Sequence, residues 1–186
     1  GRTFGFQHWP IVPDILISGK GLTGGYAPLT GVFAKESIAE PIEKTGLDVM
    51  FHTFSALAGS CAAAEKVLEI MTEENLVKRA EKIGKELKAN LATALSNHPN
   101  VAEVRGRGLL LGVEIVKNRG TLEQFPIEDK ITSKIVHEGL RRGVFFYGGG
   151  TGVVRDILVI GPPLIIDGSD VDKIVGTLSE TLDAVL

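Results

Sequence analysis

The sequence predicts an α/β protein in which the end of a larger domain precedes a small α+β domain. Two observations lead to this prediction. In the first fifty residues, short apolar runs of strand type lead into a glycine-rich loop. From residue 101 onward, strand-like runs alternate with amphipathic helical patterns. We therefore expect a remnant of a larger domain over residues 1–50, a helical connector and dimer region over 51–100 and the small α+β domain over 101–186.

The first fifty residues contain two predicted strands and one predicted helix. The apolar run Ile15–Ile17 lies within the first strand, Asp14–Ser18, which we expect to be buried. A second short strand is expected at Thr30–Ala34. Lys35–Thr45 has a helical pattern, and Pro41 is expected to bend or end part of it.

A single lysine, Lys20, follows the first predicted strand and stands in a loop of small residues. Glycines on both sides give the loop backbone conformations that other residues avoid. A lysine at the end of a buried strand is poorly placed for a solvated charge, and burial lowers the pKa of an amine. The neutral amine is a nucleophile that can form a Schiff base. A plain surface lysine in a glycine-rich turn remains the alternative, and the spacing of a phosphate-binding loop is absent.

The predicted connector and the small domain read as a succession of helices and strands. Helical patterns cover Ala56–Met71 and Glu73–Ser96, the second with leucines at helical spacing. Beyond residue 100 we expect strands at Leu109–Val116, Val144–Tyr147 and Ile157–Ile160, a helix at Ile127–Arg142, a turn or flexible loop at Gly148–Gly152, and a last helix capped by Asp167 or Ser169.

Composition excludes several classes of function. The net charge of −3 gives no general attraction to nucleic acid or to an anionic membrane. No apolar run approaches the roughly 20 residues of a membrane span, and no two histidines have zinc-ligand spacing. The single cysteine, Cys61, excludes an intrachain disulfide and fits a reducing cytoplasm, where we expect it to be a small packed residue.

Four ordered motifs resemble those of class III pyridoxal-phosphate-dependent aminotransferases, the ω-aminotransferase group. They are the lysine region from Pro13 to Leu29, the block His52–Ser55 with Cys61–Ala64, the segment Val104–Glu114, and Pro162–Leu164. The resemblance covers essentially the whole chain. It implies the fold of fold-type I enzymes that depend on pyridoxal 5'-phosphate (PLP), with a C-terminal part of the large domain and a small α+β domain.

The resemblance also implies roles for particular residues. Lys20 would form the Schiff base with PLP and then act as the general base that moves a proton between substrate and cofactor. Thr53 resembles the threonine that binds the cofactor phosphate, commonly that of the partner subunit, which makes a homodimer functional. A helix-capping role is the plainer interpretation of Thr53.

For the substrate carboxylate, the resemblance offers Arg105 and Arg155. Arg105 matches a family motif, and Arg155 lies near the place where several members carry a carboxylate-binding arginine. An arginine fork suits a carboxylate. The implied activity moves an amino group from an ω-amino acid or amine to a 2-oxo acid such as pyruvate. An aminomutase of the same fold and a non-catalytic domain that binds no cofactor stay open.

The same resemblance predicts that the chain is a C-terminal fragment. In the family, an aspartate that pairs with the cofactor ring, a phosphate loop and a stacking aromatic residue all lie upstream of the lysine. The sequence starts at Gly1 without an initiator methionine, and Asp14 does not match that aspartate because it opens the lysine strand itself. We therefore expect the chain to be inactive alone.

Overall fold

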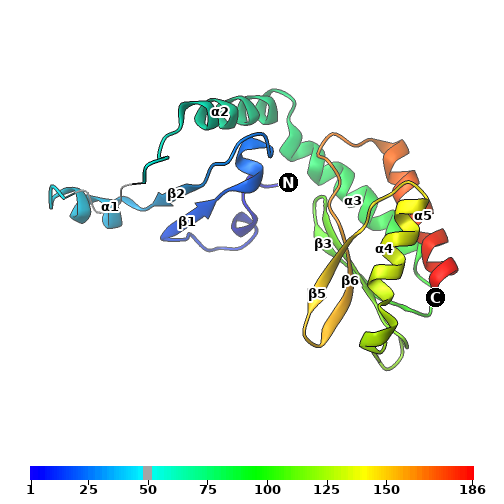
Figure 1. Cartoon of the computed structure of the whole chain (residues 1–186). Helices are drawn as coiled ribbons and strands as arrows, with labels where there is room; N and C mark the ends of the chain where they lie inside the picture. The colour runs from blue at the N-terminus through cyan, green and yellow to red at the C-terminus, as the bar shows by residue number, and fades with distance from the viewer. Residues whose placement is uncertain (48–51) are drawn as a thin grey trace. The chain divides into compact units, whose positions relative to one another are not determined.

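The computed structural model describes residues 1–47 and 52–186, and the chain divides into two compact units (Figure 1). The first unit comprises residues 2–76, and the second comprises residues 77–186 together with Gly1. The segment 51–100, predicted as one helical connector, supplies a helix to each unit. Each unit is described by itself.

The first unit holds a two-stranded sheet with helices before, between and after its strands. Strands β1 and β2 pair antiparallel, with Ile15 opposite Ala34 and Ser18 opposite Gly31. The elements in chain order are η1 (Gly5–His8), β1 (Ile15–Ser18), the 3-10 helix η2 (Lys20–Thr23), β2 (Gly31–Ala34), α1 (Glu36–Glu43) and α2 (Ala58–Glu73).

The two predicted strands of this unit are confirmed, but the expected burial of the first is wrong. Ile15 and Ile17 are both more than half exposed, and so are Val32 and Phe33 on the neighbouring strand. The reason is that β1 has β2 as its only sheet neighbour in the described chain. A two-stranded ribbon buries little of either face unless other elements cover it.

The helices of the first unit follow the predicted pattern with small shifts. Helix α1 contains Pro41 and continues to Glu43, so the helix does not end at the proline. Helix α2 begins at Ala58, two residues later than the helical pattern suggested, and Ala56 has a left-handed backbone with φ of 51°. The small residues Ser60 and Ala64 are its buried positions, whereas Cys61 is exposed, contrary to the packed role expected of it.

The second unit is a four-stranded antiparallel sheet with three helices. The strand order is β3-β4-β6-β5, which confirms the predicted small α+β domain in its antiparallel form. The elements are α3 (Leu76–Ala94), β3 (Val101–Arg107), β4 (Leu110–Ile115), η3 (Ile127–Asp129), α4 (Ile131–Arg141), β5 (Tyr147–Thr151), β6 (Val154–Ile160) and α5 (Gly168–Val185).

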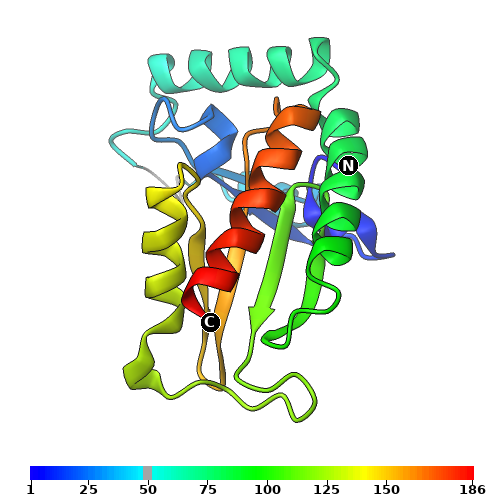
Figure 2. The same ribbon diagram turned by 90° about the vertical axis from the view of Figure 1, so that its right-hand side faces the viewer.

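Helices α3, α4 and α5 all lie over one face of this sheet (Figure 2). Inward-facing residues alternate along β4 and β6, where Leu111, Val113 and Leu158 are almost fully buried. Leucines of α3 and α5 meet them, as the helical spacing predicted, and one continuous apolar core results.

Strand β3 was not predicted. The stretch Val101–Arg107 contains a glycine and three charged residues, which obscured the strand pattern. Its charged residues Glu103, Arg105 and Arg107 nevertheless recur at every second position, and successive side chains of a strand point to opposite faces. That alternation was the signal that could have identified the strand.

Strand β5 lies three residues later than predicted, and the expected flexible loop Gly148–Gly152 supplies most of it. Tertiary packing explains why glycines form a strand here. An added Cβ would lie 2.9 Å from Thr132 Cγ2 at Gly148 and 2.7 Å from Val159 Cγ2 at Gly149. Glycine in a strand often marks such a close approach.

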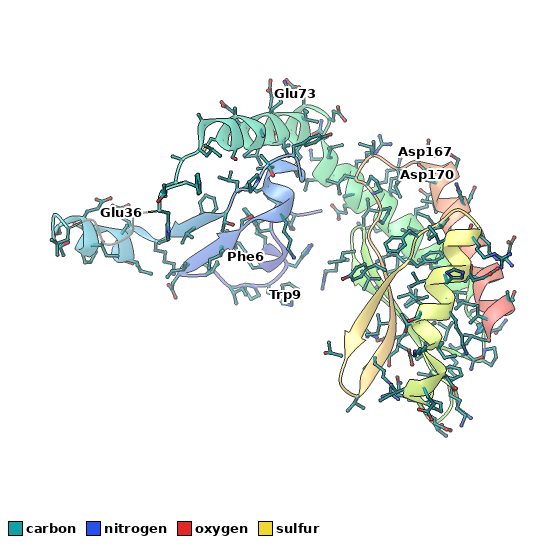
Figure 3. All side chains as sticks on the ribbon, in the orientation of Figure 1. Phe6, Trp9, Glu36, Glu73, Asp167 and Asp170 are labelled. Atoms are coloured by element: carbon teal, nitrogen blue, oxygen red, sulfur yellow. The ribbon has the colours of Figure 1, made fainter. Side chains whose placement is uncertain are left out.

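The ends of α4 and α5 show how local chemistry sets helix boundaries. The predicted helix 127–142 is broken at Lys130, which has a left-handed backbone and separates η3 from α4. Helix α5 is capped by Asp167, as predicted. The Asp167 carboxylate accepts hydrogen bonds from the backbone N–H groups of Ser169 and Asp170, and the two aspartates lie together at the helix start (Figure 3).

Candidate functional site

Lys20 is the first residue of η2 and stands one residue after strand β1. Its backbone φ is 48°, a left-handed conformation that is uncommon for a residue with a side chain. The side chain is exposed, and among the described residues its amine has no hydrogen-bond or ion-pair partner. The expectation of a buried lysine is therefore wrong for this chain, because the strand before it is itself exposed.

The loop that follows Lys20 is a chain of tight turns. Backbone N–H groups of Leu22, Gly24 and Tyr26 donate to the carbonyl oxygens three residues earlier, at 3.1, 3.0 and 3.1 Å. Gly24 and Gly25 have positive φ, which explains why glycine is required at both positions.

The loop rests on helix α2 within the first unit. Thr23 is buried, and Ser60 and Ala64 are the buried residues of α2. An added Cβ at Gly24 would lie 3.3 Å from Cγ2 of Val67, so the loop and the helix approach closely there.

Thr53 lies in a turn closed by a hydrogen bond of 2.9 Å from Ser55 N–H to the His52 carbonyl. Its side chain is exposed. The interpretation of Thr53 as a helix cap is wrong, because α2 starts at Ala58 and Leu57 occupies the N-cap position without a side-chain cap. Its exposed hydroxyl therefore does not cap helix α2.

Arg105 lies on β3, where its guanidinium pairs with two carboxylates. Nη1 donates to Glu103 on the same strand and to Glu114 on β4. These carboxylates, the hydrogen bond to Glu114 foremost, raise the pKa of Arg105. The charge of Arg105 is therefore already offset within the second unit.

Arg155 lies on β6, and its Nη2 donates to the Phe125 carbonyl at 2.7 Å. Its buried Nε has no hydrogen-bond partner among the residues that the structure describes. Arg155 borders a cavity of about 220 Å³ at the start of α4, beside Thr132 and the buried Asp156, whose carboxylate accepts a hydrogen bond of 2.7 Å from the Thr132 hydroxyl. Arg155 thus keeps donor capacity that the protein does not satisfy.

The structure does not bring the two arginines together. Arg105 pairs in register with Gly112, which pairs with Val159 on β6. Arg155 lies four residues before Val159 on that strand. Lys20 and Thr53 both belong to the first unit, whereas both arginines belong to the second.

A larger hollow of about 600 Å³ lies in the second unit and was not foreseen. It is lined by the residues before and in β5, the end of β6 and the start of α5, among them Phe145, Tyr147, Pro162, Pro163 and Lys173. The Pro162-Pro163 pair, one of the four sequence motifs, lies in the lining of this hollow and is the sequence feature that could have indicated it.

Within 1–47 and 52–186, no cluster of three or more histidine, cysteine, aspartate or glutamate side chains could hold a metal ion. No helix in the same residues combines the length and apolar character that crossing a membrane requires.

Comparison with known proteins identifies the family. The model of the class-III aminotransferases matches residues 1–182. The chain belongs to the class-III aminotransferase family. The resemblance inferred from the four sequence motifs is thereby confirmed.

Curated class-III relatives match along the whole chain. YodT, an uncharacterized aminotransferase of Bacillus subtilis (strain 168), is 39% identical over 100% of this chain and 43% of its own length. A taurine–pyruvate aminotransferase of Bilophila wadsworthia is 32% identical over 100% of the chain and 42% of its own. A putrescine–pyruvate aminotransferase of Pseudomonas aeruginosa is 32% identical over 98% and 39%. The chain thus spans about two fifths of the length of the curated relatives it matches.

Solved class-III structures confirm the fold. A transaminase from the marine bacterium Virgibacillus superposes with a TM-score of 0.93 at 31% identity, covering 99% of this chain and 42% of that one. A PLP-bound amine transaminase from an uncultivated Pseudomonas species gives a TM-score of 0.90 at 28% identity, covering 100% and 41%. The predicted α/β fold of the fold-type I, PLP-dependent transferases is therefore confirmed.

Proposed function

We propose that this chain carries the lysine-bearing part of a PLP-dependent transaminase that moves an amino group from an amine or ω-amino acid to a 2-oxo acid such as pyruvate. The observation that carries the proposal is Lys20, an exposed lysine at a sharp turn directly after a strand in a class-III aminotransferase chain. Relatives named for taurine, putrescine and pyruvate support this substrate class.

The residues present fit the cofactor in part. Lys20 offers an accessible amine, and Thr53 offers an exposed hydroxyl in a turn that is not used as a helix cap. A phosphate accepts hydrogen bonds from such a hydroxyl and from backbone N–H groups. When bound, PLP supplies a carbonyl carbon for the amino group and a ring that withdraws electrons.

The chain's own residues then have distinct tasks. Lys20 would hold the cofactor through Nζ and, once released by the incoming amine, take up a proton from the substrate carbon at the same atom. Thr53 would orient the phosphate, which we propose belongs to the partner subunit of a homodimer. The exposed apolar side chains of Phe54 and Leu57 beside Thr53 support a protein contact at this place.

Trapping with borohydride tests the role of Lys20. The protein is incubated with PLP and reduced with borohydride. Its intact mass is then measured, and the modified lysine is identified by peptide mapping. We expect the reduced adduct to form predominantly on Lys20, with only minor labelling of other lysines. The Lys20 adduct is lost in Lys20→Ala and kept in the matched variant Lys44→Ala, since Lys44 is an exposed lysine of the same unit paired with Glu40. Labelling spread evenly over surface lysines would contradict the proposal.

We propose that the 186-residue chain by itself does not turn over substrate. Its match to about two fifths of its relatives' length and the exposed apolar faces of β1 and β2 support this. Pyruvate-dependent deamination of putrescine or taurine by this polypeptide would refute it. A required 2-oxo acid in any such turnover would favour a transaminase over an aminomutase.

For the substrate carboxylate we propose Arg155 ahead of Arg105. Arg155 borders a cavity and donates to the Phe125 carbonyl, whereas two carboxylates already engage Arg105. Titration of the chain with pyruvate, followed through the arginine side-chain resonances in NMR spectra, tests this order. A shift of Arg105 alone would reverse it.

We also propose a cytoplasmic location for the protein. The single cysteine, Cys61, is exposed and unpaired, which suits a reducing compartment. Fractionation of cells that express a tagged form tests this, and recovery in an oxidising compartment would contradict it.

A further inference from the structure

We propose that Thr23 is a positioning residue for Lys20: its buried hydroxyl closes the lysine loop and thereby fixes the direction in which the amine projects. The inference rests on the proposed function of Lys20. It concerns a residue three positions further along the same 3-10 helix, η2.

The hydroxyl of Thr23 makes a short and buried hydrogen bond. Thr23 is 1% exposed, although most residues around it are exposed. Its Oγ1 donates to the Ala27 carbonyl at 2.5 Å. A buried hydroxyl without a partner would be costly, so this bond and the burial of the side chain depend on one another.

The hydrogen bond spans the most flexible part of the loop, which contains two consecutive glycines. Between Thr23 and Ala27 lie Gly24 and Gly25, with φ of 61° and 84°. Consecutive glycines leave the unfolded loop many conformations. The hydroxyl bridge, together with the backbone bond from Tyr26 N–H to the Thr23 carbonyl, selects one of them.

Lys20 needs such support because its own backbone is strained. A lysine with φ of 48° adopts a conformation that persists only where the surroundings impose it. Lys20 begins the turn whose last residue is Thr23, and the turn is anchored on helix α2 where Ser60 and Ala64 are buried. If the anchor at Thr23 is lost, the first residue to relax is Lys20.

A purely structural threonine and a positioning threonine make different predictions. The first would change the stability of the unit and affect its lysines equally. The second would change the reactivity of Lys20 toward PLP relative to another lysine of the same unit, such as Lys44. The ratio of the two reactivities therefore distinguishes the roles.

The test compares Thr23→Ser with Thr23→Ala, since these variants differ only in the hydroxyl. Each is incubated with limiting PLP, reduced at intervals, and mapped for adducts on Lys20 and Lys44. We expect the Lys20-to-Lys44 ratio to fall about tenfold in Thr23→Ala and to stay within about twofold of the parent protein in Thr23→Ser, because misplacement of a reacting group by about 1 Å is costly.

Amide hydrogen exchange without cofactor supplies the second readout. The N–H groups of Leu22, Gly24 and Tyr26, which close the turns, should exchange faster in Thr23→Ala than in Thr23→Ser. Thr72→Val is the matched control, since the Thr72 hydroxyl also donates to a carbonyl four residues away, that of Leu68, but on an exposed face of α2. It should change neither readout.

Each outcome decides a claim. An unchanged adduct ratio in Thr23→Ala, with Lys20 still labelled, would overturn the positioning role and leave the proposed function standing. A parallel loss on Lys20 and Lys44 would make Thr23 merely structural. If the parent protein forms no adduct on Lys20, the proposed function and the inference fail together.

Discussion

The two units of this chain differ in the size of their buried apolar cores. In residues 77–186, a four-stranded sheet and three helices enclose a continuous core that includes Leu91, Phe146 and Leu158. In the described residues of 2–76, the buried apolar side chains are Ala64 and Leu76, while both isoleucines of β1 are exposed. Lys20 thus belongs to the unit with the smaller core. Similar strand and helix patterns in sequence therefore do not guarantee similar burial.

The largest effect should appear in amide hydrogen exchange. Core amides open only with the unfolding of the unit, whereas poorly buried strands open locally. We expect the amides of β4 and β6 to exchange on the order of a thousandfold more slowly than those of β1 and β2, as a stability of about 5 kcal/mol or more implies. Equal protection in both pairs would show that the first unit has a cooperative core of its own.

Truncation of apolar side chains should show the same contrast at single residues. Phe146→Ala should destabilise the second unit by about 4 kcal/mol, because a fully buried aromatic side chain is lost. Ile17→Ala should cost less than about 0.5 kcal/mol, since this side chain is 68% exposed. Urea unfolding, monitored by hydrogen exchange of the amides in β6 and in β1, measures the change in stability caused by each substitution. A large cost at Ile17 would break the comparison.

A pair of helical glycines sharpens the comparison within the second unit. A Cβ at Gly84 of α3 would lie 2.2 Å from the Gly108 carbonyl oxygen, so Gly84→Ala should cost about 2 kcal/mol. A Cβ at Gly176 of α5 meets nothing within 4 Å. Gly176→Ala should instead stabilise the unit by about 0.5–1 kcal/mol, because alanine favours the helix. Thermal unfolding of the two variants must shift in opposite directions.

The smallest effect concerns the cap of α5 and its dependence on pH. The hydrogen bond from the Ser169 hydroxyl, followed by those from the Asp170 and Ser169 backbone N–H groups, lowers the pKa of Asp167. A carboxyl group with a lowered folded-state pKa stabilises the protein above its unfolded pKa of about 3.9, and this contribution is lost as the pH falls through the folded value.

Between about pH 4 and pH 2, the Tm of the parent protein should therefore fall more steeply than that of Asp167→Asn, by a few degrees, because asparagine caps a helix without titrating in this range. Asp172→Asn, an exposed aspartate of the same helix, is the matched control and should retain the parent slope. Parallel Tm curves for the parent protein and Asp167→Asn would contradict the capping contribution.

Sequence reasoning reached most of the elements and the family. Apolar periodicity located α3 and α5 because their inward leucines repeat at helical spacing, and Asp167 marked a helix start because a carboxylate satisfies free N–H groups there. It missed β3, where charged residues hid a regular alternation, and it misplaced β5, where glycines are dictated by Thr132 and Val159 from other elements. Such contacts leave no local signal.

The candidate site divides in the same way. The chemistry of Lys20 and Thr53 was inferred from residue type and motif, and their roles stay predictions. The free hydroxyl of Thr53 depended on where α2 begins, which local pattern placed two residues too early. The sequence gives no sign that Thr23 matters, because its proposed role depends on a hydrogen bond to the Ala27 carbonyl and on burial of its side chain.

By itself the sequence determined the family, most of the strands and helices, and the position of the lysine for which we propose a catalytic role, because these depend on residue type and spacing along the chain. Only the tertiary structure decided which strands are buried and why β5 requires glycines where Thr132 and Val159 approach it. It also decided that Arg105 is paired with carboxylates, that Arg155 Nε has no partner among the described residues, and that the Thr23 hydroxyl closes the lysine loop. The physical reason is that burial and hydrogen-bond partners are properties of neighbours in space, and a sequence lists only neighbours along the chain.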